Sequence, residues 1–545
     1  MRNDMTERRF DSIVVGAGFA GLYMLYRLRQ LGLSAQIIEA AEDVGGVWYH
    51  NRYPGAGCDM ESLVYSYSFS SELEQEWEWK HRFARQPEIL SYLQHVAERF
   101  DLRRDIQFTT RVVAARYDEL SQLWSVDTDR GERFSTKFLI MATGCLSASF
   151  TPSFEGLGSF GGRYLRTSAW PHEPVDFAGQ RVAVIGTGSS GIQCIPLIAQ
   201  QAAHLTVFQR TPNFSLPARN APLDAEFVRR FKQSYPHYRE RVRAGDLFGD
   251  GDLCVPIESL DPPPVSVSDA SDEEIQRAYE ERWQRGGGFF IGAFSDIMNT
   301  DEANRTAADF VRNKIRSIVK DPRVAKLLTP TDHPLGAKRL CIDTDYYATF
   351  NRPNVTLVDL RSDPIRAITP RGVLLESGEV AVDAIVMATG FDAVTGPLLA
   401  IEIAGVGGQT LRDKWKHGPR TYLGLGIAGF PNLFTITGPG SPSVLSNTVN
   451  SIEQHVDWIS GCLAHMNQHG FARVEPTVEA EDDWVEQVDK AADAWLYKKA
   501  TNSWYLGANI PGKPRVFMPY VDSGGAYRRI CDGVAANHYQ GFVLR

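Results

Sequence analysis

The stretch IVVGAGFAGLYMLYRLRQLGLSAQIIE, residues 13–39, decides the fold. A short apolar run enters a glycine turn with the spacing Gly-x-Gly-x-x-Gly, a helical stretch follows, and a second apolar run ends at Glu39. The glycines of such a unit permit a tight turn, backbone approach to a pyrophosphate, and close packing of helix on strand. A carboxylate at the end of the second strand accepts hydrogen bonds from a ribose diol and repels a 2′-phosphate, which predicts FAD or NAD. The residues expected to hold this dinucleotide are Gly16, Gly18, Phe19, Ala20, Gly21 and Glu39.

A second unit, VAVIGTGSSGIQCIPLIAQQAAHLTVFQRT at residues 182–211, repeats the plan with one chemical difference. Its second strand-like run is followed by Arg210 and Thr211 and by no acid. An arginine at that place pairs with a 2′-phosphate, so the unit predicts an NADP site. The residues expected there are Gly186, Thr187, Gly188, Ser189, Ser190, Gly191, Gln193, Arg210 and Thr211.

Composition narrows the class of protein. At 545 residues the chain is long enough for two or three domains, and its 43% hydrophobic and 23% charged residues are typical of a globular protein. The net charge of −9 disfavours nucleic acid or an anionic membrane as a partner. No apolar run reaches the roughly 18 residues of a membrane span, and residues 1–9 hold no apolar signal segment. Seven scattered cysteines without a Cys-x-x-Cys pair predict reduced thiols, a cytoplasmic protein and no metal site.

The two nucleotide units predict an α/β fold with two Rossmann-like domains, one for FAD and one for NADP. The sequence Ala-Thr-Gly follows an apolar run at residues 142–144 and again at 388–390, and we interpret both as crossovers between the domains. The expected division is a FAD domain over 1–147 and 391–545, the latter carrying substrate-pocket loops, an NADP domain over 148–221 and 331–390, and a mostly helical insert over 222–330.

Helical patterns support the insert. Residues 271–274 read Ser-Asp-Glu-Glu, the spacing of a capping box, and Ile275, Tyr279 and Trp283 follow at helical intervals. A second apolar stripe runs from 310 to 319. The proline run at 262–264 and the glycine run at 286–288 predict loops.

Two dinucleotides in one chain restrict the chemistry. NADPH donates a hydride, and a flavin can pass the two electrons to a disulfide, to another carrier or to dioxygen. A disulfide reductase needs a redox-active cysteine pair beside the flavin, and the sequence has none. The remaining classes are an oxygen-activating monooxygenase and a reductase that serves an external acceptor.

One further stretch carries a family resemblance. The sequence GGVWYHNRYPGAGCD at residues 45–59 resembles the fingerprint of Baeyer–Villiger monooxygenases, a Gly-Gly-x-Trp segment followed by Tyr/Phe-Pro-Gly and an Asp. The segments at 210–212, 338–339, 388–392, 438–442 and 503–509 are similar to the branch that contains phenylacetone and steroid monooxygenases, so the resemblance covers nearly the whole chain. It implies FAD and NADPH as cofactors, a small ketone and dioxygen as partners, no obligate protein partner, and insertion of oxygen to give an ester or lactone, with sulfides also oxidised.

The resemblance also implies residue roles. Arg339 would be the catalytic cation that stabilises a peroxyflavin, and Asp59 would hold its guanidinium. Lys338 and Arg210 would clamp the 2′-phosphate. The implied cofactor site further includes Gly46, Val47, Trp48, Tyr53, Asp59 and Arg339. The implied ketone pocket comprises Val47, Met60, Cys145, Leu146, Ser441, Pro442, Ser443, Val444, Leu445, Ser446, Trp504 and Met518.

Two alternative functions remain open. A related flavin monooxygenase would act mainly on amines or sulfides, and the segment at 45–59 together with Arg339 argues against it as the main activity. A non-catalytic, nucleotide-binding redox sensor belongs to a different class. Bound flavin and NADPH-dependent oxygen consumption would distinguish an enzyme from such a sensor.

The chain departs from the family pattern at one position. The second family fingerprint, Phe-x-Gly-x-x-x-His-x-x-x-Trp, is matched here by Phe160, Gly162, Arg166 and Trp170, so arginine replaces the histidine. Arginine keeps a cation and donors but lacks an acceptor nitrogen and does not deprotonate. Either the segment is a linker and the side chain at position 166 only fixes its geometry, or the family's histidine exchanges a proton and this chain lacks that function.

Substituting Arg166 by histidine separates these two interpretations. We expect the natural protein to release some hydrogen peroxide, because a longer and permanently charged side chain changes both hydrogen bonding and volume in an interdomain linker. Arg166→His should then raise the ratio of ester formed to NADPH consumed. The check is to measure peroxide and ester for both forms, and tight coupling in the natural protein with no gain from histidine would contradict the expectation.

Overall fold

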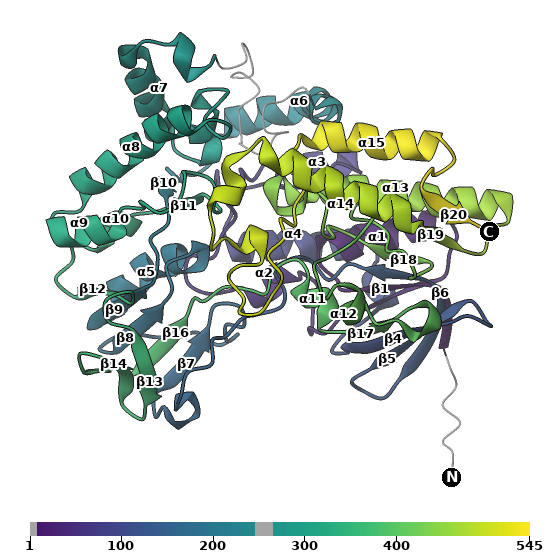
Figure 1. Ribbon diagram of the computed structural model, residues 1–545, viewed down its shortest axis with the longest axis horizontal. Coiled ribbons are helices and arrows are strands. Elements are labelled where there is room, and N and C mark those ends of the chain that lie inside the picture. Colours follow the sequence, from purple (N-terminus) through teal and green to yellow (C-terminus); the bar gives the residue numbers. More distant parts are fainter. Residues whose placement is uncertain (1–7, 246–264) are drawn as a thin grey trace.

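The computed structural model describes residues 8–245 and 265–545. The first glycine turn follows β1 (Arg8–Val15), which lies between β2 (Ala35–Ile38) and β6 (Arg133–Met141) and runs parallel to both. The sheet order is β17-β4-β5-β6-β1-β2-β3, and β18 pairs with the end of β6. Its other strands are β3 (Ile106–Gln107), β4 (Val112–Asp118), β5 (Leu123–Thr128), β17 (Glu402–Ala404) and β18 (Leu433–Thr435). Distant parts of the chain therefore share one sheet (Figure 1).

Both faces of this first sheet are covered. Val14 of β1 packs into a core with α1 (Phe19–Gln30) and α13 (Thr448–His469), whereas its neighbours Ile13 and Val15 enter a separate core on the opposite face. Alternate side chains of β1 are thus buried on both sides, which explains why its sequence is a continuous apolar run and not an alternating one.

The second glycine turn belongs to a five-stranded sheet in which every pairing is parallel. Its order is β12-β9-β8-β16-β7, and α5 (Ser189–Gln201) follows the turn after β8. A three-stranded antiparallel sheet packs on one face of it through a shared apolar core. The strands are β7 (Arg163–Arg166), β8 (Arg181–Ile185), β9 (His204–Gln209), β12 (Val355–Asp359) and β16 (Ala384–Met387), and in the small sheet β13 (Ile365–Thr369), β14 (Gly372–Leu375) and β15 (Glu379–Ala381).

The described part of the expected insert is helical, but it does not form one unit. α6 (Ala225–Ala244) places Phe231, Tyr235 and Tyr238 in the core beneath α1 and α13, so it belongs to the first domain. α7 (Asp272–Arg285), α8 (Asp301–Ile318) and α9 (Pro322–Leu328) pack instead against the second domain. The capping box at Ser271 and Glu274 is confirmed. The glycine run at 286–288 leads from α7 into a short 3-10 turn, and the proline run at 262–264 lies outside the described residues.

The remaining elements connect the domains or cover them. The helices are α2 (Val47–His50), α3 (Ser71–Glu76), α4 (Gln86–Arg99), α10 (Tyr346–Thr349), α11 (Gly396–Leu399), α12 (Leu411–Lys414), α14 (Val478–Asp493) and α15 (Gly524–Ala536). Two strand pairs are β10 (Ser215–Pro217) with β11 (Cys341–Asp343), and β19 (Val474–Pro476) with β20 (Phe542–Leu544). Within residues 8–245 and 265–545, no helix is long and apolar enough to cross a membrane, and all six cysteines are free.

Candidate active site

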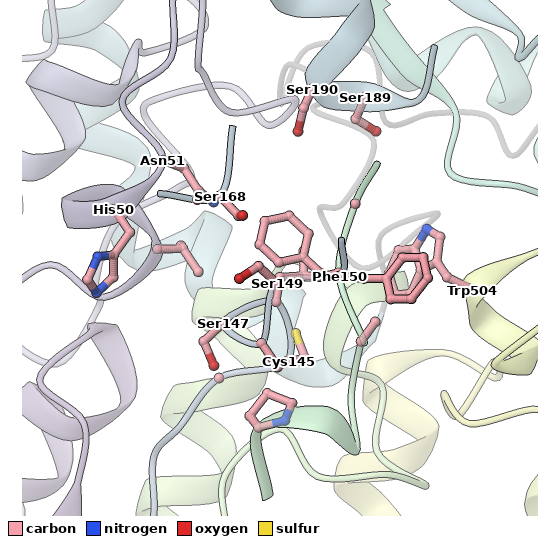
Figure 2. Close-up of a pocket in the computed structure, with 18 of the residues that line it drawn as sticks. His50, Asn51, Cys145, Ser147, Ser149, Phe150, Ser168, Ser189, Ser190 and Trp504 are labelled. Carbon is pink, nitrogen blue, oxygen red and sulfur yellow. The ribbon is translucent and has the colours of Figure 1, made fainter. Parts of the chain in front are cut away.

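The carboxyl ends of β1 and β8 open onto one cavity of about 1130 Å³. Both glycine turns and both Ala-Thr-Gly segments contribute to its wall. Figure 2 shows Phe150 in the middle of this space, with His50 on one side, Trp504 on the other, and Ser189 and Ser190 of α5 beyond. The two nucleotide units of the sequence therefore face each other across a shared volume.

The first glycine turn forms a cradle of backbone atoms. Gly16 has φ of +106°, and a Cβ there would lie 2.6 Å from the carbonyl oxygen of Ala142. A Cβ on Gly21 would lie 1.8 Å from the carbonyl oxygen of Gly16, because helix and strand touch there. Gly18 is the N-cap of α1 and supplies no side-chain cap, so the first N–H groups of the helix point toward the cavity. Such a cradle fits the pyrophosphate of a dinucleotide.

Glu39 lies buried just after β2 and lines the cavity. Its Oε2 accepts a hydrogen bond from Ala17 N at 2.6 Å, and its Oε1 accepts one from Ala41 N at 2.7 Å. Burial raises the pKa of this carboxyl, and the backbone donors oppose the rise. Each oxygen keeps acceptor capacity, so the side chain fits a ribose diol.

The second glycine turn has the same build. Gly186 has φ of +112°, and a Cβ on it would lie 2.4 Å from the carbonyl oxygen of Ala388. A Cβ on Gly191 would lie 2.2 Å from the carbonyl oxygen of Gly186. Gly188, the N-cap of α5, has no atom within 4 Å of such a position and provides no side-chain cap. The second cradle therefore also fits a pyrophosphate.

Two cations lie together at the rim of the second cradle. Arg210 and Lys338 both line the cavity. Burial lowers the pKa of Lys338 to about 8, Asp332 opposes the shift, and the charge of Arg210 lowers the pKa further. Thr211, next to Arg210, accepts a hydrogen bond on Oγ1 from Asn502 Nδ2 at 3.4 Å. A 2′-phosphate would relieve the repulsion between the two cations, so the chemistry of this rim fits NADP.

Arg339 and Asp59 meet where the two halves of the cavity join. Arg339 Nε lies 3.4 Å from Asp59 Oδ2, and Arg339 Nη1 donates to the carbonyl oxygen of Val444 at 3.1 Å. Burial opposes the charge of the guanidinium, but the carboxylate of Asp59 holds its pKa above the ordinary value. Burial raises the pKa of Asp59, and Arg339 opposes that rise. Asp59 Oδ1 is buried with no hydrogen-bond partner in the structure. The pair thus keeps a permanent cation at the cavity wall.

Only some of the residues expected to form the ketone pocket line the cavity. The lining of the cavity includes Val47, Met60, Cys145, Leu146, Val444 and Trp504. Five expected residues lie behind the wall: Ser441, Pro442, Ser443, Leu445 and Met518. Ser441 turns its hydroxyl inward to the carbonyl of Gly438 at 2.7 Å, and Met518 is buried in an apolar core. Ser446, the last residue of the expected loop 441–446, also lines the cavity.

The second fingerprint forms a joint between the domains. Arg166 ends β7, is exposed and lines the cavity. Trp170 is buried against Phe177, and its backbone N–H donates to the carbonyl of His50 across the domain boundary at 3.4 Å. Phe160 packs against the core below the small sheet, and a Cβ on Gly162 would lie 2.3 Å from Asp383 O. Of the four residues, only Arg166 faces the cavity.

Sequence reasoning missed several residues of the cavity. Phe150 follows the first Ala-Thr-Gly segment, and its carbonyl accepts a hydrogen bond from Thr389 Oγ1 of the second at 2.8 Å. His50 ends α2, and burial lowers the pKa of its imidazole, with Arg111 adding to the effect. Phe150 lies in an irregular segment and His50 in a helix of four residues, and neither is long enough to carry a periodic signal. The recurrence of Ala-Thr-Gly was the one sequence signal near Phe150, where the segments that follow and contain these repeats contact each other.

Comparison with known proteins gives consistent matches over the whole chain. A family model described as flavin-binding monooxygenase-like matches residues 11–236. A Baeyer–Villiger monooxygenase of Pseudooceanicola batsensis is 45% identical over 98% of this chain and 96% of its own length. A phenazine N-monooxygenase of Lysobacter antibioticus is 41% identical over 99% of this chain and 98% of its own. The solved structure of a steroid monooxygenase bound to NADP is 52% identical, covers 98% of this chain and 99% of its own, and has a TM-score of 0.92. The chain therefore belongs to the Baeyer–Villiger monooxygenase family of flavin-binding monooxygenases.

Proposed function

We propose that this protein inserts one oxygen atom of dioxygen next to the carbonyl carbon of a small ketone, using FAD and NADPH. Ketone, dioxygen, NADPH and a proton give ester or lactone, NADP and water. One observation carries the proposal: two dinucleotide cradles open onto one cavity, and the pair of Arg339 and Asp59 lies at their junction. Bound in the first cradle, FAD supplies the redox chemistry that activates dioxygen.

Arg339 is the residue that we assign to charge stabilisation. An oxygen atom acquires negative charge during such an insertion, and a fixed cation in a water-poor site stabilises that charge strongly. Asp59 and the carbonyl of Val444 orient the guanidinium from two sides, so Arg339 needs no reorganisation when charge develops. Met60, Leu146 and Trp504 supply apolar surface beside it and exclude water from the carbonyl.

The substrate class has one competing candidate. The relative named for phenazine N-oxygenation has nearly the same identity to this chain as the relatives named for ketones, so oxygenation of a ring nitrogen remains a second candidate. A panel of ketones, thioethers and heteroaromatic amines, with products identified by gas or liquid chromatography, tests the assignment. Product formation only from amines would overturn it. A non-catalytic redox sensor is disfavoured, because it would not require a buried cation placed beside an apolar pocket.

We further propose a cytoplasmic location, supported by the free state of the six cysteines that lie in the described part of the chain. A small ketone and dioxygen suffice as partners in this proposal.

Arg210→Ala should weaken the use of NADPH selectively. Loss of one charge-assisted contact to the 2′-phosphate is expected to lower kcat/KM for NADPH roughly 10- to 150-fold, equivalent to about 1.5 to 3 kcal/mol. The value for NADH should change little, because NADH lacks that phosphate. Arg316→Ala, which removes an exposed arginine of α8, is the control. Equal use of NADH and NADPH by the natural protein would contradict the assignment.

The preference for NADPH should also fall with rising pH. Below pH 8 Lys338 is protonated and attracts the 2′-phosphate, whereas above pH 8 the free enzyme loses that charge. The ratio of kcat/KM for NADPH to that for NADH should therefore drop by about tenfold between pH 7 and pH 9. Lys338→Arg keeps its charge over this range and should give a flatter profile. A pH-independent ratio in the natural protein would show that Lys338 does not contact the phosphate.

Arg339→Ala should separate flavin binding from oxygenation. Neither glycine cradle involves this side chain, so we expect full FAD content by absorbance. Ester formation should be abolished, because Arg339 is the cation that Asp59 and the carbonyl of Val444 hold at the cavity wall. The measurement is ester yield by gas chromatography alongside NADPH consumption, and normal yields would remove Arg339 from the mechanism.

A further inference from the structure

A buried ion pair lies behind the cavity wall, outside the site described above. Arg239 of α6 has a side chain that is 4% exposed, and its Nε lies 2.8 Å from Oε1 of Glu74, whose side chain is 7% exposed. The mechanism described so far does not use this pair. Burying two charges carries a large desolvation penalty, so such a pair persists only where its geometry is fully determined by further contacts.

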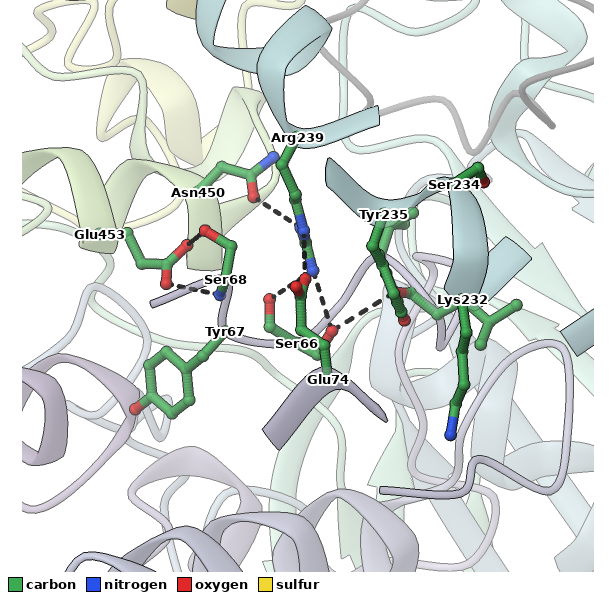
Figure 3. Close-up of polar contacts among 12 residues, drawn as sticks. Ser66, Tyr67, Ser68, Glu74, Lys232, Ser234, Tyr235, Arg239, Asn450 and Glu453 are labelled. Atoms are coloured by element: carbon green, nitrogen blue, oxygen red, sulfur yellow. Dashed lines mark hydrogen bonds and ion pairs between the residues drawn. The ribbon is translucent and has the colours of Figure 1, made fainter. Parts of the chain in front are cut away.

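The contacts of Arg239 reach two different segments (Figure 3). Its Nη2 donates to the carbonyl oxygen of Ser66 at 3.2 Å and to the hydroxyl of Ser66 at 3.1 Å. Its Nη1 donates to Oδ1 of Asn450 on α13 at 3.5 Å. Arg239 thus uses the whole planar fork of its guanidinium, and it joins α6, the segment 63–68 and the first turn of α13.

Neighbouring side chains reinforce the same junction. Tyr235, one turn before Arg239, donates to the carbonyl oxygen of Leu63 at 2.6 Å. Glu453 of α13 accepts hydrogen bonds from the backbone N–H and the hydroxyl of Ser68, at 2.6 and 2.7 Å. Burial raises the pKa of Glu453, and the charge of Arg239 opposes the rise. One guanidinium therefore sits between two buried carboxyl groups.

The two segments that Arg239 joins are the ones that hold Arg339. The first continues back from Ser66 to Tyr65, Met60 and Asp59, which all line the cavity. The second begins with the turn that contains Val444, whose carbonyl accepts from Arg339. Asn447 caps α13 and donates to the carbonyl of Val64 at 2.8 Å, so the segments touch directly as well. Arg339 therefore links Asp59 of the first segment to Val444 of the second at the cavity wall. Arg239 links the same two segments at a place behind that wall.

We propose that Arg239 is a positioning residue that sets the spacing between the segments 59–66 and 444–450, and through it the geometry of Arg339 against Asp59. The proposal rests on the oxygenation proposed above. Lysine cannot reproduce the function, because a single ammonium group cannot reach Glu74, Ser66 and Asn450 with fixed planar geometry. A loosened Arg339 leaves cofactor reduction in place and lowers the fraction of turnovers that end in oxygen insertion.

The same helix supplies a matched control. Lys232 of α6 is also buried, with a side chain 7% exposed, and its Nζ lies 2.6 Å from Glu78 and 2.7 Å from the carbonyl of Gln75. These partners lie in the segment 75–78, which does not line the cavity. Lys232→Met therefore removes a buried cation from α6 without touching the junction of 63–68 with α13.

The experiment compares Arg239→Lys with Lys232→Met in the full-length holoenzyme. For each variant we would measure FAD content, melting temperature, the rate of NADPH oxidation, and ester and hydrogen peroxide per NADPH. Arg239→Lys should keep NADPH oxidation within about twofold and lower the ratio of ester to peroxide by at least about fivefold. Lys232→Met should keep the ratio of the natural protein, even where its melting temperature falls.

Two further variants keep the result decisive. Asn450→Ala removes only the hydrogen bond from Arg239 to the first turn of α13 and should lower the same ratio, so it serves if Arg239→Lys does not fold. Combining Arg239→Lys with Arg339→Lys should give less than the product of the single effects, because both act on one geometry. An unchanged ratio in folded Arg239→Lys and Asn450→Ala, or an equal loss in Lys232→Met, would overturn the proposal. Absence of ester from the natural protein would overturn instead the proposed oxygenation.

Discussion

The ion pair of Asp59 and Arg339 joins one residue from each of two domains. Much of the remaining structure holds the two domains at the distance that this pair requires. Asp59 follows the first glycine cradle and α2, whereas Arg339 precedes β11 on the side of the second cradle. Burying two charges costs the same desolvation free energy whether or not their geometry is good. A buried ion pair is therefore stabilising only when both partners are held in place. The carbonyl of Val444, the joint around Trp170 and the crossovers at the Ala-Thr-Gly segments all restrain the distance between the domains.

The features that the sequence predicts correctly are those in which a local pattern has a local cause. The glycines at 16 and 186 lie at positive φ with a carbonyl oxygen against them, so only glycine fits, and the spacing of the turn is visible in the sequence itself. The same holds for the capping box at Ser271, where two side chains three residues apart satisfy each other. Glu39 and Arg210 each come one helix and one strand after their glycine turn, and the regular geometry of these elements fixes where the residue after the strand lies.

The features that the sequence does not predict depend on which part of the chain a given surface packs against. The sequence does not show that α6 packs against the first domain, because periodicity carries no information about the partner of a helix. Ser441 and Met518 belong to loops near the cavity, and a half-turn of backbone decides whether such a side chain faces the ligand or the core. Phe150 and His50 line the cavity from short segments that are fixed by contacts from far along the chain.

The interlacing of the two domains determines the order in which they can be completed during synthesis. All five strands of the second sheet have been synthesised by residue 387, whereas the first sheet needs β18 and its covering helix α13, which ends at residue 469. The apolar face around Val14 is among the first parts of the chain to emerge, and it waits on the order of tens of seconds for α13 at ordinary elongation rates. The domain that begins the chain is therefore the last to close, and we expect chaperones that shield exposed strands to determine how much of this protein reaches the folded state.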